Sequence, residues 1–172
     1  MVNTAAGGPM IYTGKGKSRK GSLDDELEME NVYVVDTSVI IEDPDVFFNL
    51  GRKWIVVPTA VIRELDGLKR STDSKKACAA KRASRTLDDL GYRQDIAFGA
   101  ITSAGSVVRI FSRYETVNDL ESWADNRIVG AAVRLKEENK HYNVVMVSND
   151  RNMCTITRAY GIEAEHYPFS RN

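Results

Sequence analysis

The chain has 172 residues, 42% of them apolar and 28% charged, and its 24 Lys and Arg residues balance its 24 Asp and Glu residues. This length and composition are typical of an ordinary soluble domain that buries a sizeable core, and the balanced charge argues neither for nor against a nucleic-acid partner. We find no apolar run of the ~20 residues that a membrane span needs, no signal peptide and no cysteine motif for metal binding, so we expect a cytoplasmic protein.

The first 30 residues differ in character from the rest of the chain. They are rich in glycine, lack apolar periodicity, and change from basic over residues 15–20 to acidic over residues 24–30. Such a segment has too few apolar residues to pack a core of its own. We therefore predict a flexible N-terminal arm over residues 1–30 and a single domain over residues 31–172.

The first predicted strand ends at an acidic residue. Val32 to Val35 is a short run without a polar face, as expected of a strand buried on both sides, and Asp36, Thr37 and Ser38 follow it. A carboxylate at the carboxyl end of a buried parallel strand lies where open α/β sheets bind their ligands. Alternatively, Asp36 or Ser38 caps a following helix.

Short apolar strands and amphipathic helices then alternate. A helix opens after Asp43-Pro44-Asp45 and ends at Gly51, and a buried strand follows over residues 54–57. Thr59 is expected to cap the next helix, which carries Glu64 near the edge of its apolar face. A long helix over residues 75–90 ends at Gly91. Cys78 in this helix and Cys154 further on are expected to be reduced and to pack in the core.

The second half of the chain repeats this alternation. We predict a strand over residues 107–111, at a sheet edge because Arg109 interrupts it, a helix over 125–138, a buried strand over 143–147, a helix ended by Gly161, and a last strand over 162–167. The whole pattern predicts an α/β fold: a doubly wound, mainly parallel sheet of about five strands with helices on both faces.

Four acidic residues are expected to meet at one edge of this sheet. Asp36 and Asp150 follow buried parallel strands, Glu64 lies one turn into a helix, and Asp125 opens another helix. Carboxylates gathered in this way repel one another unless a cation neutralises them, and Mg²⁺ and Mn²⁺ prefer such oxygen ligands. Ser38 or Thr37 could supply a hydroxyl to a metal-bound water or a phosphate, and Asp119 is a further candidate ligand.

Each acid also has a structural explanation. Asp125 and Asp150 are good helix N-caps, and Glu64 could be a solvated helix residue paired with Lys69 or Arg63. Only the joint placement of the four acids favours a metal site over these separate roles.

Four segments of the chain read VVDTSVII, VPTAVIRELDGLK, DNRIVGAA and VVMVSND. Together they resemble the PIN domain family of metal-dependent ribonucleases, and the resemblance covers about residues 31–167 in the family's order. It implies a PIN-like fold, an acidic pocket that binds Mg²⁺ or Mn²⁺ through Asp36, Glu64, Asp125 and Asp150, and cleavage of single-stranded RNA by an activated water. The segments look closest to PIN domains that precede PhoH-type ATPase modules, although no P-loop motif occurs here.

A basic stretch flanks the predicted pocket and could follow an RNA backbone. Such a surface gives salt-dependent affinity, but a Lys- and Arg-rich helix face is often only solvated. The candidate backbone contacts are Arg63, Lys69, Arg70, Lys75, Lys76 and Arg82. The candidate residues for base stacking are Tyr92, Tyr114 and Trp123.

Other functions remain open at this stage. A haloacid-dehalogenase phosphatase would need a second acid where Ser38 stands, and a phosphoryl-accepting receiver domain would place an acidic pair after its first strand. A non-catalytic PIN-like scaffold, a toxin-type ribonuclease held by an antitoxin, a nuclease preferring DNA and a homo-oligomer are all compatible with the sequence.

Overall fold

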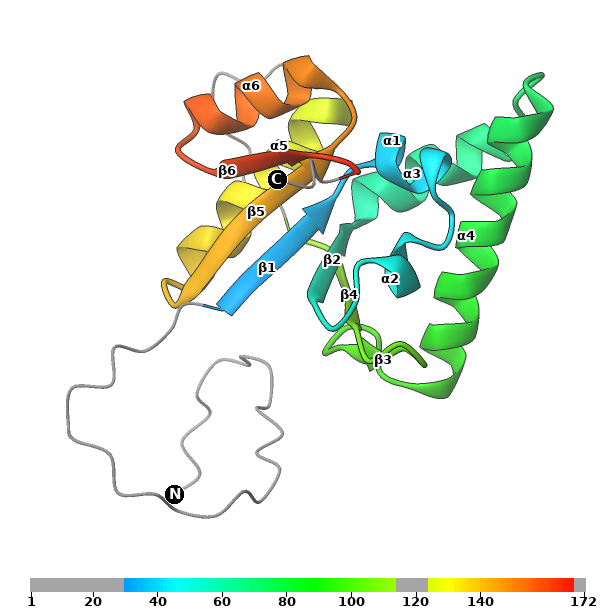
Figure 1. The fold of residues 1–172 in the computed structure, drawn as a ribbon, viewed down its shortest axis with the longest axis horizontal. Helices are drawn as coiled ribbons and strands as arrows, with labels where there is room; N and C mark the ends of the chain where they lie inside the picture. Colours follow the sequence, from blue (N-terminus) through cyan, green and yellow to red (C-terminus); the bar gives the residue numbers. More distant parts are fainter. Residues whose placement is uncertain (1–29, 114–123, 169–172) are drawn as a thin grey trace, which may run out of the picture.

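Six strands form one sheet in the order β3-β4-β2-β1-β5-β6, and all neighbouring pairs are parallel except β3 with β4 (Figure 1). The computed structural model describes residues 30–113 and 124–168. The strands are β1 (Glu30–Val35), β2 (Trp54–Pro58), β3 (Ala100–Ile101), β4 (Val107–Phe111), β5 (Tyr142–Ser148) and β6 (Glu163–His166). The helices are α1 (Thr37–Glu42), α2 (Val46–Asn49), α3 (Thr59–Leu68), α4 (Ser74–Arg93), α5 (Ala124–Glu138) and α6 (Arg151–Ala159).

Helices cover both faces of the sheet. Figure 1 shows α4 on one side of the sheet and α5 and α6 on the other. This arrangement follows from the strand order, because the chain winds outward from β1 through β2 to β4 and then crosses back to β5 on the other side of β1. The predicted doubly wound α/β fold is confirmed. No helix in the two described ranges is both long and apolar enough to cross a bilayer.

The central strand β1 positions the carboxyl edge of the sheet. It pairs with β2 on one side and with β5 on the other, and Val34 and Val35 are fully buried. In this register Val35 lies opposite Val147 of β5, so the residues that follow the two strands also lie side by side. Burial on both faces explains why the part of β1 from Val32 to Val35 is an uninterrupted run without a polar face.

Two predictions about the strands are corrected by the structure. The sheet has six strands and not about five, because β3 pairs antiparallel to β4. The sequence did not predict β3, since a strand of two residues is too short to leave a periodic signal. Because β3 pairs with it, β4 is not an edge strand but lies between β3 and β2. Arg109 is tolerated there because its guanidinium donates to the carbonyl of Ala97 at 2.9 Å and lies over the Phe111 ring.

Two helix boundaries also differ from the predicted ones, the end of α4 and the start of α3. Helix α4 does not stop at Gly91 but runs to Arg93. A Cβ at Gly91 would lie 3.3 Å from the Ile96 side chain, so this glycine makes room for packing instead of ending the helix. Thr59 does not cap α3: it is the first helical residue, the N-cap is Pro58, and no side chain caps this helix start.

The two cysteines have different environments. Cys154 is 3% exposed and packs in the core, as predicted, whereas Cys78 is exposed on α4. The prediction for Cys78 was wrong because the buried stripe of α4 is made by its alanines and Leu87, and Cys78 lies outside that stripe. The stripe consists of Ala77, Ala79, Ala80, Ala83 and Leu87.

The predicted N-terminal arm over residues 1–30 lies outside the described residues except for Glu30, the first residue of β1.

Candidate metal centre at the carboxyl edge of the sheet

Asp36 is a nearly buried carboxylate at the end of the central strand. It is 4% exposed, and its backbone N–H still donates to the carbonyl of Val147 at 3.0 Å, so the sheet ladder holds its position. Its Oδ1 accepts from the Thr37 N–H at 2.6 Å, which makes Asp36 the N-cap of α1. Its Oδ2 accepts from the hydroxyls of Ser38 at 2.6 Å and Ser148 at 2.7 Å.

Ser148 is part of this site, and the sequence reasoning missed it. It is fully buried at the end of β5 and lies beside Asp36 because β5 and β1 are in register. Its hydroxyl also accepts from the Asp150 N–H at 3.0 Å, while the Ser38 hydroxyl accepts from the Asn149 N–H at 3.0 Å. The two serines thus fasten the loop after β5 to the carboxylate after β1. The only signal in the sequence was a polar residue directly after a buried strand.

Glu64 is joined to Asp36 through one residue. The Thr37 hydroxyl donates to Glu64 Oε2 at 2.5 Å, while the Thr37 N–H donates to Asp36. Glu64 is half-buried on α3, as its place at the edge of the apolar face predicts. The structure therefore brings Asp36, Glu64, Thr37 and Ser38 together.

Asp150 occupies the same edge but caps its own helix. It is exposed, and its Oδ1 accepts from the N–H groups of Asn152 at 2.7 Å and Met153 at 3.4 Å, so the structural role named above is present. Asp150 and Asp36 nevertheless both act electrostatically on the side chain of Cys154. Burial raises the pKa of the Cys154 thiol, Arg158 opposes this, and the negative charges of Asp150 and Asp36 raise the pKa further.

Asp125 lies in the first turn of α5, but its side chain is outside the described residues, and so are Asp119, Tyr114 and Trp123. Among the side chains that the structure describes, no three of the His, Cys, Asp or Glu type form a ligand cluster. The full four-acid set therefore stays a proposal.

The environment of Asp36 fits a cation. Within the described part of the chain Asp36 makes no ion pair, and all of its hydrogen-bond donors are neutral. A buried carboxylate normally has a positive partner, because burial of an unpaired charge is costly. The surrounding atoms that could bind a cation are carboxylate and hydroxyl oxygens, which are the ligands that Mg²⁺ and Mn²⁺ prefer.

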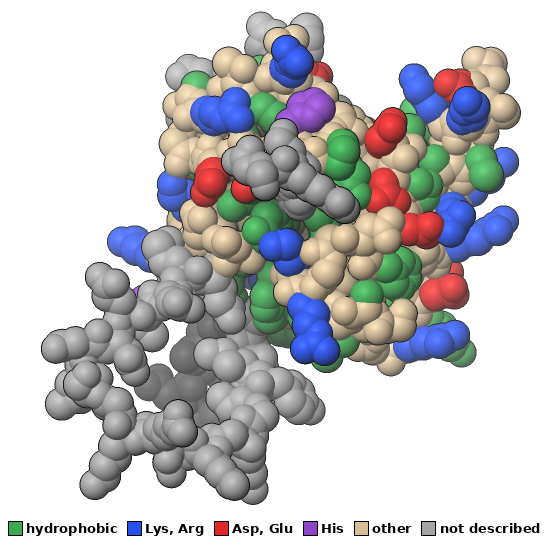
Figure 2. Space-filling view, viewed as in Figure 1, with side chains coloured by type: hydrophobic (Ala, Val, Ile, Leu, Met, Phe, Trp, Pro, Cys, Tyr) green, Lys and Arg blue, Asp and Glu red, His purple; other side chains and the backbone are tan. Residues whose placement is uncertain are grey.

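Some of the residues predicted to contact an RNA backbone are already paired with acids, and others are not. Arg82 is held by Asp45 through two hydrogen bonds of 3.0 and 2.6 Å, and Asp66 pairs with Lys69 at 3.3 Å and with Arg70 at 4.0 Å. The side chains of Arg63, Lys75 and Lys76 are exposed and make no ion pair within the described ranges. Figure 2 shows Lys and Arg side chains along the right side of the molecule, where α4 lies, with Asp and Glu side chains beside and among them.

Comparisons with known proteins agree with this fold. The profile of the PIN domain family matches residues 33–168. PhoH2 of Bacillus subtilis is 29% identical over 148 residues, which are 81% of this chain and 33% of that protein. The transcriptional protein SWT1 of Saccharomyces cerevisiae is 28% identical over 149 residues, which are 77% of this chain and 32% of SWT1. The chain thus spans about a third of the length of these relatives.

A solved structure supports the fold alone. A domain of a protein of unknown function from Methanocaldococcus jannaschii superposes with a TM-score of 0.53 at 16% sequence identity, covering 83% of this chain and 94% of that one.

Proposed function

Because the chain belongs to the PIN domain family, a family of the nuclease type, we propose that it is a divalent-metal-dependent nuclease that hydrolyses phosphodiester bonds of single-stranded RNA. The observation that carries the proposal is the buried Asp36 carboxylate, which lies at the carboxyl end of the central strand and is linked through Thr37 to Glu64. A helix cap alone would not need a carboxylate this deeply buried beside a second one.

Asp36 and Glu64 are the residues that would hold Mg²⁺ or Mn²⁺, and Asp125 and Asp150 would complete the set. A bound divalent ion supplies a water of lowered pKa and neutralises charge that develops on a phosphate. The residues of this chain supply the positioning. The N–H of Thr37 and the hydroxyls of Ser38 and Ser148 fix the Asp36 carboxylate, and the Thr37 hydroxyl fixes Glu64 beside it.

The two serines also limit how far the site can move. Each hydroxyl donates to Asp36 and accepts from a backbone N–H of the loop after β5, so the carboxylate and this loop are held as one unit. Rigid placement of the reacting groups is a large part of what an enzyme contributes to phosphate chemistry.

A cleavage assay with the purified chain tests the proposal. We expect labelled single-stranded RNA to be cut with Mg²⁺ or Mn²⁺ and to remain intact with EDTA. Single-stranded DNA of matched sequence tests for a nuclease that prefers DNA, and duplex RNA tests strand preference. Absence of metal-dependent cleavage of every substrate would contradict the proposal and favour the scaffold.

The similarity to the PhoH2 proteins bears on possible partners. Because the chain matches about a third of those relatives, we propose that an ATPase module, in the same protein or as a partner, delivers RNA to the nuclease site. A toxin-type ribonuclease controlled by an antitoxin remains the second candidate within the same enzyme class.

A further inference from the structure

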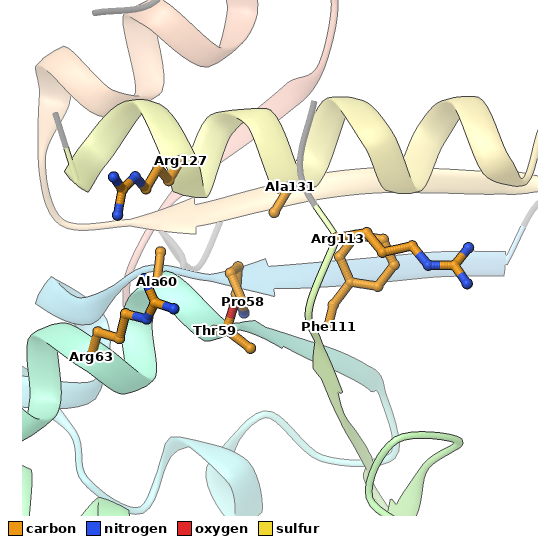
Figure 3. A pocket seen from close by; sticks show the side chains of 8 residues that line it. All are labelled: Pro58, Thr59, Ala60, Arg63, Phe111, Arg113, Arg127 and Ala131. Carbon is orange, nitrogen blue, oxygen red and sulfur yellow. The ribbon is translucent and has the colours of Figure 1, made fainter. Parts of the chain in front are cut away.

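Three arginines border a small pocket next to the acidic site. The pocket lies at the carboxyl ends of β2 and β4, between α3 and α5 (Figure 3). Its volume is about 20 Å³, which is room for about one water molecule, so it can take one oxygen of a ligand but not a nucleobase. Its floor includes Pro58, Phe111 and Ala131, all of them buried.

Two of the three arginines at this pocket have no charged partner among the side chains that the structure describes. Arg63 from α3 and Arg127 from α5 make no side-chain hydrogen bond or ion pair with any described side chain. Figure 3 shows Arg127 and Arg63 on two helices that face each other, both in the left part of the view, while the Arg113 guanidinium points to the right, away from them. Arg113 forms an ion pair with Glu138 at 3.1 Å, so its charge is already neutralised.

The pocket and the acidic site share the carboxyl edge of the sheet, because Pro58 ends β2 and Asp36 follows its neighbour β1. Arg63 directly precedes Glu64, and Arg127 comes two residues after Asp125. The start of α3 adds a weaker effect: no side chain caps it and no acid lies in its first turn, so its N–H groups keep their partial positive charge next to the pocket.

We propose that Arg63 and Arg127 form a phosphate-binding subsite, which holds one backbone phosphate of a single-stranded nucleic acid beside the acidic site. The guanidinium groups bind the phosphate by charge-assisted hydrogen bonds, and one phosphate oxygen enters the pocket. The subsite rests on the proposed function for its ligand. It adds Arg127 and a specific place for the strand, between α3 and α5.

Binding measured without metal separates this subsite from cleavage. We would titrate the full chain, in EDTA, into a 5′-fluorescein-labelled 12-nucleotide oligouridine and follow anisotropy at several salt concentrations. The test variant is R63Q/R127Q. The matched control is R52Q/R93Q, which removes the same charge from two exposed arginines, Arg52 before β2 and Arg93 at the end of α4.

We expect R63Q/R127Q to bind about tenfold more weakly than the control, because each arginine loses a charge-assisted contact. The slope of log K against log salt should fall by about 0.7, since the subsite holds one phosphate and each neutralised phosphate of a single strand contributes about 0.7. Oligothymidine should lose the same factor, because the contact is to phosphate. R63K/R127K should keep most of the salt slope but not the full affinity.

Equal weakening of R63Q/R127Q and its control would overturn the subsite, and so would failure of the parent chain to bind either oligonucleotide. Circular dichroism and urea unfolding of each variant identify any loss of fold, and the single variant R63Q, at an exposed position, must then weaken binding by itself. If the chain binds through the two arginines but does not cleave, the result supports the phosphate-binding subsite and contradicts the proposed nuclease function.

Discussion

Asp36→Asn should lower metal-dependent RNA cleavage by about 10³-fold or more, because the neutral amide removes the most buried negative charge of the site. The loss corresponds to about 4 kcal/mol of transition-state stabilisation. Initial rates of cleavage of a labelled single-stranded RNA, at saturating Mn²⁺, measure it.

The same variant should keep its fold. Asn has the shape of Asp, its side-chain oxygen can still accept from the Thr37 N–H, and its amide can donate to the Ser38 or Ser148 hydroxyl after a rotation of that hydroxyl. The matched control is Asp66→Asn, which changes an exposed acid on α3 that pairs with Lys69 and Arg70. Cleavage by Asp36→Asn at the rate of this control would contradict a catalytic role for Asp36.

Ile40→Ala should destabilise the protein by about 2–5 kcal/mol. Ile40 is fully buried on α1, and a six-residue helix is too short to form without tertiary packing. Because Thr37 and Ser38 lie on the same helix, looser packing of α1 should also weaken their hold on Asp36 and Glu64. Urea unfolding monitored by circular dichroism measures the change in the free energy of unfolding.

The matched control is Ile156→Ala, which truncates an isoleucine that is 39% exposed on α6. We expect a much smaller loss there, because little apolar area is removed from the core. A loss for Ile40→Ala no larger than that of the control would mean that α1 is not anchored by its buried face.

The fold could be predicted from the sequence because the elements that matter carry strong periodic signals. The run from Val32 to Val35 is apolar on both faces, and α3 and α5 have apolar stripes at helical spacing. These signals arise because the buried positions of a strand or helix must be apolar, and any chain that forms this sheet has the same buried positions. The strand β3, with two residues, and the helical continuation through Gly91 carry no such signal, because they depend on the tertiary partners of these segments.

The candidate site could be predicted only in part, for a similar reason. Asp36 could be predicted because it directly follows an apolar strand, and Glu64 because it lies near the edge of the apolar face of its helix. Ser148 was missed because its role depends on the register between β5 and β1. Arg127 was missed because only the three-dimensional structure places it beside a pocket, without a partner among the described side chains.

Direct binding of Mn²⁺ is the closest test of the account, which holds that acids from separate segments of the chain share a divalent cation. Isothermal titration calorimetry of the parent chain, Asp36→Asn, Glu64→Gln and Asp66→Asn makes the comparison without a substrate. We predict that Asp36→Asn and Glu64→Gln each bind Mn²⁺ at least about tenfold more weakly than the parent, whereas Asp66→Asn binds like the parent. Equal Mn²⁺ affinity in all four proteins would contradict the account.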